Sequence, residues 1–210
     1  MKYLKKLKKT GIMGGTFNPI HMGHLIIAEK AREQFGLDEV LFLPSGVPYM
    51  KDSKEVLPGK IRMEMTGLAI QGNPFFTISG MEVGREGRTY TYETLEALQE
   101  QNPDTEYYFI LGADSLWMIE NWKNPERIFA ACHILAAGRD EKAVEDMEKQ
   151  ALYLKEKFGA DIFLLQTGKI EISSSMIRGL CREGKSIRYL VPEAVYNYIM
   201  ENGLYGEFEA

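Results

Sequence analysis

Short apolar runs that alternate with helical patterns constrain the fold more than any other feature of this 210-residue chain. Six runs predict strands, at 11–13, 40–43, 75–79, 107–111, 133–136 and 162–165. Helical spacing of apolar residues predicts helices at 24–35, from about 60, at 91–101, 125–130, 141–158, 174–183 and 192–202. In the helix that starts near 60, the expected buried stripe is Ile61, Met65, Leu68 and Ala69.

Strand–helix alternation predicts a mostly parallel sheet that is covered by helices on both faces. We therefore expect a Rossmann-like, doubly wound α/β fold, with the C-terminal helices packed on it. No internal repeat or break in composition marks a second domain, so residues 1–210 are expected to form a single domain.

Charge and composition exclude some classes of protein. The net charge of -5 gives no sign of bulk binding to nucleic acid or membranes. Nowhere do 18 apolar residues run together, and the basic residues 1–9 precede no apolar run, so neither a membrane span nor a signal peptide is expected. Cys132 and Cys181 lie in apolar surroundings and are expected to be small core residues, which suits the reducing cytoplasm.

The segment Gly14–His24, here called the double-histidine loop, directly follows the first expected strand. Ligands of open α/β sheets bind beyond the carboxyl ends of the strands. Gly14 and Gly15 let the backbone approach a ligand closely. His24 falls at the start of a helix, where free N–H groups and the helix dipole attract anions. The segment therefore predicts a phosphate site.

The chain has three histidines, and two of them, His21 and His24, fall within four residues. Histidine pairs that bind metal on a helix more often have i, i+4 spacing and an acidic neighbour, which are missing here. The loop also lacks the Gly-x-Gly-x-x-Gly and Gly-Lys-Ser/Thr patterns of dinucleotide and P-loop sites. His133, in an apolar run, is expected to be a core or strand-end histidine.

A second candidate phosphate element lies at Ser173, Ser174 and Ser175, before an expected helix. Serines at a helix start cap N–H groups and can present them to an anion. Arg178 lies three residues beyond Ser175 and can bind the same phosphate through its forked guanidinium.

The double-histidine loop resembles the motif of the nucleotidyltransferase superfamily that is marked by His-x-Gly-His. Residues 172–178 resemble that superfamily's second motif, Ile-Ser-Ser-Thr-x-Ile-Arg, and Ser175 keeps the hydroxyl of the threonine. The loop alone also suits pantetheine-phosphate adenylyltransferases, cytidylyltransferases and, more distantly, class I aminoacyl-tRNA synthetases. The resemblance implies that both histidines contact a triphosphate and stabilise the transition state.

Further blocks are similar to those of the bacterial nicotinate-nucleotide adenylyltransferase family. They are residues 43–48 followed by Lys51, Arg85 with 89–95, 110–115 with Trp122, and 189–192 with 198–205. The likeness runs from about Gly11 to Tyr205. The chain departs from the family at two places. Tyr49-Met50 stands where the family has Pro-His, and Gly138-Arg139 stands where it has Arg-Pro-Gly. The roles of the loop around Tyr49-Met50 and of Arg139 are left open.

The resemblance assigns candidate roles to three sets of residues. The catalytic set is His21, His24 and Arg178. The ATP-binding set is Gly14, Gly15, Thr16, Phe17, Gly23, Lys51, Gly112, Ser173, Ser174 and Ser175. The mononucleotide-binding set is Asn18, Thr89, Tyr90, Thr91, Asp114, Trp122 and Lys123.

Recognition of a pyridine ring needs an aromatic platform, and tryptophan offers the largest face. Trp122 lies in a polar stretch and is expected to be exposed enough to serve, whereas Trp117 is expected in the core. Backbone N–H groups near Thr89 and Lys123 are expected to hold the nicotinate carboxylate.

The family implies an enzyme that transfers the adenylyl group of ATP to nicotinate mononucleotide, giving deamido-NAD and pyrophosphate in NAD biosynthesis. A phosphate monoester is largely ionised at neutral pH, so its attack needs no general base. Mg²⁺ is expected with ATP and is held mainly by phosphates, with no protein metal site. ATP and the mononucleotide are the expected partners in the cytoplasm, with no nucleic acid or membrane; a homo-oligomer and the preference over nicotinamide mononucleotide are left open.

Two alternatives remain beside this expectation. Another adenylyltransferase of the superfamily, such as a pantetheine-phosphate adenylyltransferase, would keep the loop but not the blocks around Tyr90, Asp114 and Trp122. A non-catalytic nucleotide-binding module could keep the fold, although the intact histidine pair with Arg178 argues against it.

Overall fold

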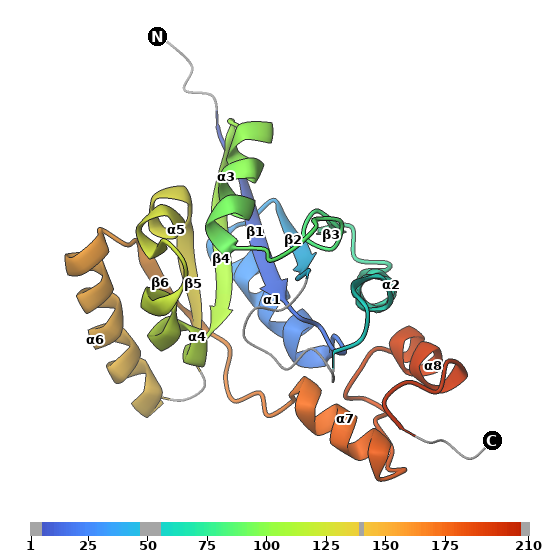
Figure 1. Ribbon diagram of the computed structural model, residues 1–210. Coiled ribbons are helices and arrows are strands. Elements are labelled where there is room, and N and C mark those ends of the chain that lie inside the picture. The colour runs from blue at the N-terminus through green and yellow to red at the C-terminus, as the bar shows by residue number, and fades with distance from the viewer. Residues whose placement is uncertain (1–5, 47–55, 139–140, 207–210) are drawn as a thin grey trace. The chain divides into compact units, whose positions relative to one another are not determined.

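The structure is a computed structural model that describes residues 6–46, 56–138 and 141–206. Its strands are β1 (Lys8–Gly15), β2 (Glu39–Pro44), β3 (Phe76–Ile78), β4 (Thr105–Gly112), β5 (His133–Gly138) and β6 (Ile162–Gln166) (Figure 1). Its helices are α1 (Met22–Phe35), α2 (Gly59–Ile70), α3 (Thr91–Gln101), α4 (Ala113–Met118), the 3₁₀ helix η2 (Ile119–Asn121), α5 (Pro125–Ala131), α6 (Glu141–Phe158), α7 (Ser174–Arg182) and α8 (Glu193–Glu201).

The strands form a six-stranded sheet in the order β3-β2-β1-β4-β5-β6. β1 pairs parallel with β4, β4 with β5, and β5 with β6. The order reverses between β1 and β4, as in doubly wound nucleotide-binding folds. The predicted Rossmann-like α/β fold is therefore confirmed.

The central strands β4 and β5 carry continuous apolar runs, because both faces of the sheet are buried there. In β4 the residues from Tyr107 to Leu111 are buried, and in β5 Ile134, Leu135 and Ala136 are fully buried. These continuous apolar runs, rather than alternating ones, are what the sequence showed for the expected parallel strands.

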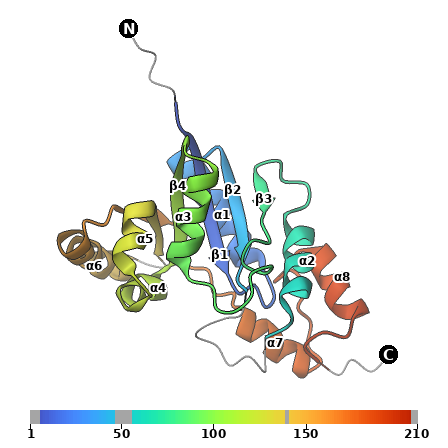
Figure 2. The ribbon, with the colours of Figure 1, turned by 45° about the horizontal axis from the view of Figure 1, so that its top comes forward.

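The contacts within the chain divide it into two compact units, each described here by itself. The first unit consists of Met1–Met13, Ala28–Leu41 and Tyr90–Lys169. In it, α3 packs against α5, and α6 packs against β5 and β6. Figure 2 shows α6 beside α5. The second unit consists of Gly14–Ile27, Phe42–Thr89 and Ile170–Ala210, and in it α2 packs against α8. The expectation of one domain stays a prediction.

Most predicted elements are confirmed to within a few residues, but α4 and η2 were missed. No element was predicted for the segment 113–121, whereas Leu116 and Ile119 are buried at helical spacing. The expected stripe of α2 was also partly wrong. Its buried side chains are Arg62, Met65, Thr66 and Ile70, while Ile61, Leu68 and Ala69 are half-buried.

Three smaller expectations can be compared with the structure. Cys132 and Cys181 are free and buried, as predicted. His133 is the first residue of β5, half-buried between Asp161 and Glu106, so it is a strand-end histidine. In the described parts of the chain, no helix has the length and apolar character that crossing a membrane requires.

Candidate active site

The double-histidine loop turns tightly at the end of β1, and the buried ring of one of its own residues, Phe17, supports it. Phe17 is almost fully buried and has a positive φ of 47°. Its ring meets His24 edge-on at 5.0 Å and lies 6.0 Å from the ring of Phe42. A Cβ on Gly15 would lie 2.9 Å from this ring, so glycine is required there. The ring of Phe17 is thus part of the support of the loop.

His21 and His24 are held together by both ring stacking and backbone hydrogen bonds. Their rings stack with centroids 3.7 Å apart. The backbone N–H of His21 donates to Nδ1 of His24 (3.3 Å), and the backbone N–H of His24 donates to the carbonyl of His21 (3.0 Å). Because Nδ1 of His24 accepts a hydrogen bond, its neutral ring carries the proton on Nε2. Nε2 of His24 is therefore a hydrogen-bond donor.

Gly23 makes room for the ring of His21. A Cβ at this position would lie 3.0 Å from Nδ1 and 3.1 Å from Cε1 of His21, and 3.1 Å from Cγ2 of Ile170. The glycine of the His-x-Gly-His pattern is therefore explained by packing inside the loop.

Burial sets the charge of His21. The residue is only 6% exposed, and its Nδ1 has no hydrogen-bond partner among the residues that the structure describes. Burial lowers the pKa of His21 to about 4, so the ring is neutral at pH 7. Without a bound anion, His21 therefore offers a neutral ring to the site.

This buried histidine predicts a loss of stability in acid. In the unfolded chain a histidine titrates near 6.5. Between that pH and about 4 the unfolded state therefore binds a proton that the folded state does not. The free energy of unfolding should fall through this window, by roughly 3 kcal/mol from His21 alone, and be fully restored above it. Urea unfolding of the wild type and of His21→Asn at pH 7 and pH 4 measures the difference, and equal pH dependence in the two proteins would contradict it.

The N-terminus of α7 is attached to the double-histidine loop. Ser173 caps the helix, since its Oγ accepts from the N–H of Met176 (3.2 Å). The hydroxyl of Ser174 donates to the carbonyl of Pro19 (2.8 Å), and Nη1 of Arg178 donates to the carbonyl of Asn18 (3.0 Å). The second unit therefore brings together the two predicted phosphate elements, although 155 residues separate Pro19 from Ser174.

Asn18 is a buried junction of the same network. Its Oδ1 accepts from the hydroxyl of Tyr205 (2.9 Å) and from the N–H of Leu57 (3.3 Å). Tyr205 follows α8, and its pKa is raised by burial, so its hydroxyl stays protonated and donates. The side chain of Asn18, expected to bind the mononucleotide, thus joins three segments of the second unit.

Arg62 is the polar residue of this region that sequence reasoning missed. It is 1% exposed and donates to the carbonyl of Thr16 in the double-histidine loop and to that of Ser45 in the turn after β2. Helical spacing in the sequence could have indicated this burial, because Arg62 lies three residues before the buried Met65 and therefore on the same face of α2.

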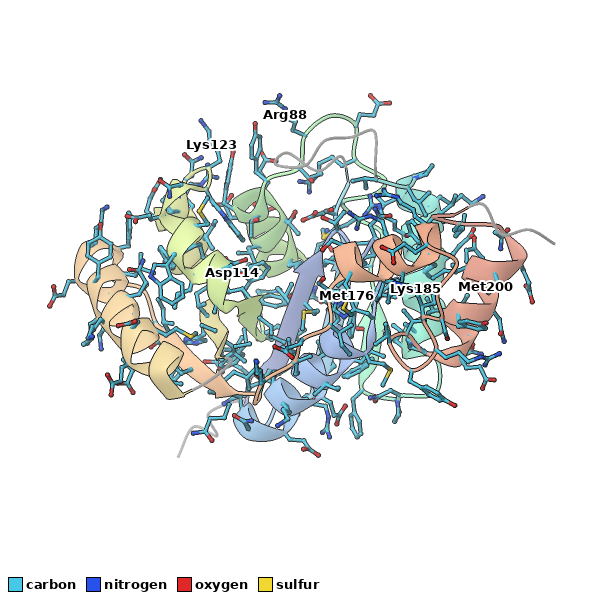
Figure 3. All side chains as sticks on the ribbon, turned by 90° about the horizontal axis from the view of Figure 1, so that it is seen from below. Arg88, Asp114, Lys123, Met176, Lys185 and Met200 are labelled. Carbon is cyan, nitrogen blue, oxygen red and sulfur yellow. The ribbon has the colours of Figure 1, made fainter. Side chains whose placement is uncertain are left out.

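The first unit carries most of the predicted mononucleotide site. Gly112 ends β4, Asp114 lies in the first turn of α4, and Lys123 lies just before α5; the three are exposed (Figure 3). Trp122 is half-buried, with its ring edge-on to Phe109 at 6.2 Å. Trp117, expected in the core, is 39% exposed, because the short helix α4 turns it outward while Leu116 is buried.

The block near Tyr90 begins α3. Tyr90 is its N-cap residue and Thr91 its first residue, and both are half-buried. Thr89 belongs to the second unit, where its hydroxyl lies 3.4 Å from the carboxylate of Glu82. Lys51, Tyr49, Met50 and Arg139 lie outside the described residues.

The residues present also bear on a metal ion. Within the described ranges, no three His, Cys, Asp or Glu side chains gather into a group that could hold one. In the part of the chain that the structure describes, His21 and His24 are therefore not members of such a group.

The chain is similar to known proteins over most of its length. Residues 12–180 match the model of the cytidylyltransferase-like family. A protein of Lachnoclostridium phytofermentans named "Probable nicotinate-nucleotide adenylyltransferase" is 49% identical, over 95% of this chain and 100% of that protein. A protein of Geobacter sulfurreducens with the same name is 42% identical, over 94% of this chain and 98% of that protein.

Among solved structures, the nicotinic acid mononucleotide adenylyltransferase of Plasmodium falciparum complexed with NaAD has the same fold. The TM-score is 0.77 at 21% identity, over 94% of this chain and 97% of that one. Fold and loop thus define the class, the cytidylyltransferase-like nucleotidyltransferases. Within that class, the chain belongs to the nicotinate-nucleotide adenylyltransferase family.

Proposed function

We propose that the chain transfers the adenylyl group of ATP to nicotinate mononucleotide, giving deamido-NAD and pyrophosphate. The observation that carries the proposal is the stacked pair His21 and His24, attached through Asn18 and Pro19 to the N-terminus of α7. The pair, the helix N-terminus and Arg178 are donors of the kind that bind phosphates. The identity of the two substrates is inferred from the family to which the chain belongs.

The reaction is an in-line displacement at the α-phosphorus of ATP. A phosphate oxygen of the mononucleotide forms the new P–O bond, and the bond between the α-phosphorus and the bridging oxygen of the β-phosphate breaks. Pyrophosphate leaves with that electron pair. The attacking phosphate is already ionised at neutral pH, so no residue needs to remove a proton from it.

The chain's contribution is therefore positioning and stabilisation of charge. His24 donates from Nε2 to an oxygen of the transferring or leaving phosphates, while Arg178 and the α7 N-terminus add positive charge. His21 is neutral in the free enzyme, and binding of a triphosphate beside it would raise its pKa by favouring the charged form. Lys51 is proposed as a further phosphate ligand from the sequence alone. A Mg²⁺ ion that enters with ATP would neutralise part of the triphosphate charge.

The mononucleotide is assigned to Trp122, Asp114, Tyr90, Thr91 and Lys123. The half-buried ring of Trp122 keeps surface on which a pyridine ring can stack. The exposed Asp114 would orient the mononucleotide, through its ribose for example. The two buried free thiols suit a reducing compartment, so we place the protein in the cytoplasm, acting on small molecules.

A substrate panel tests this proposal. Purified protein with ATP and Mg²⁺ is offered nicotinate mononucleotide, nicotinamide mononucleotide and phosphopantetheine, and pyrophosphate release is measured. We expect the fastest release with a pyridine mononucleotide. Release with phosphopantetheine alone would indicate the other adenylyltransferase, and ATP binding without release from any acceptor would indicate a non-catalytic module.

A further inference from the structure

Arg62 is a buried cation that donates to four main-chain carbonyls. Its Nε donates to Leu57 (2.9 Å) and its Nη1 to Thr16 (2.6 Å). Its Nη2 donates to Ser45 (2.7 Å) and Gly46 (2.9 Å). These acceptors come from the double-histidine loop, the turn after β2 and the segment before α2. One side chain thus fixes three segments of the second unit.

Among the residues that the structure describes, no carboxylate pairs with Arg62, and burial lowers the pKa of its guanidinium. Burying a cation is costly, and charge-assisted hydrogen bonds to the carbonyl dipoles offset that cost. Stability alone does not explain the choice, because an apolar side chain of similar volume would avoid the desolvation cost.

The orientation of the carbonyls gives the guanidinium a function. In a trans peptide, the C=O and the following N–H point in opposite directions. Because the carbonyls of Thr16 and Ser45 point at Arg62, the N–H groups of Phe17 and Gly46 point away from it. The turn at Gly46 has little freedom to adjust, since a Cβ there would overlap the backbone carbonyl of Glu82.

We propose that Arg62 is a positioning residue for nucleotide binding, which rests on the function proposed above. It turns the peptide groups of the double-histidine loop and of the Ser45–Gly46 turn so that their N–H groups face the phosphates. It acts through the main chain and does not contact the substrate.

The test separates positioning from mere stability by a matched control in the same helix. Arg62→Met removes the hydrogen-bond donors and keeps a similar side-chain volume. Arg62→Lys keeps the charge, but its single ammonium group cannot reach carbonyls in three segments. Met65→Ala, at a fully buried position of α2, destabilises the fold without touching these carbonyls. Turnover and ATP affinity are measured per folded molecule, well below the unfolding temperature of every variant.

We expect kcat/KM for ATP to fall about tenfold or more in Arg62→Met, less in Arg62→Lys, and not at all in Met65→Ala. If Arg62→Met does not fold, Arg62→Lys decides. The inference is overturned if the Arg62 variants that fold keep wild-type kcat/KM and ATP affinity. If the proposed function is wrong, the wild type binds ATP without releasing pyrophosphate. In that case, weakened ATP binding in Arg62→Lys would still support the positioning role.

Discussion

Replacing His24 by alanine should lower kcat about 10²–10³-fold, the usual cost of losing one preorganised donor to the transition state. The geometry makes this residue the strongest candidate, because the backbone N–H of His21 donates to Nδ1, so that the neutral ring carries its proton on Nε2. The KM for ATP should change far less than kcat, since the interaction strengthens as charge develops on the phosphates.

The third histidine provides the control. His133 begins β5 and lies between Asp161 and Glu106, at the opposite end of the strand from the carboxyl ends where ligands bind. His133→Ala should keep wild-type kcat. Steady-state pyrophosphate release from the two variants measures the difference, and near-normal turnover in His24→Ala would remove the residue from the mechanism.

Replacing Trp122 by alanine should raise the KM for nicotinate mononucleotide by roughly tenfold to a hundredfold. Stacking of a heterocycle on an aromatic side chain contributes about 1–3 kcal/mol. The ring is held edge-on by Phe109 and is half-buried, so it is an ordered platform rather than a mobile surface side chain. The KM for ATP should change much less, because ATP is assigned to other residues.

Trp117 is the matched control, since it is the other tryptophan of the chain and is exposed on α4. Trp117→Ala should leave both KM values unchanged. Kinetics with each substrate varied in turn distinguish the outcomes. An unchanged mononucleotide KM in Trp122→Ala, or a larger rise in Trp117→Ala, would show that Trp122 is not the platform.

The sequence predicted the fold well because its signals are local. Apolar runs without alternation predicted the buried strands β4 and β5, and the loop with His21 and His24 stood directly after the first strand. The helix α4 was missed because it has only six residues, too few for a repeating apolar pattern.

What could not be predicted depends on contacts between distant segments. The neutral state of His21 comes from its burial in the folded chain, which a motif read along the sequence does not reveal. Arg62 was overlooked because a charged residue on a helix is ordinarily assigned to the solvent face, and only the converging carbonyls explain its burial. Trp117 and Trp122 were assigned from the polarity of their neighbours. This wrongly placed Trp117 in the core, and Trp122, expected to be exposed, is half-buried.

The most direct test of the central claim follows the α-phosphorus of ATP. The protein is incubated with Mg²⁺, nicotinate mononucleotide and ATP labelled at either the α- or the γ-phosphate, and the products are separated. Adenylyl transfer predicts that the α-label appears in the dinucleotide and the γ-label in pyrophosphate. Recovery of the γ-label in the mononucleotide product, or of both labels in unchanged ATP, would contradict the assignment of this chain as an adenylyltransferase.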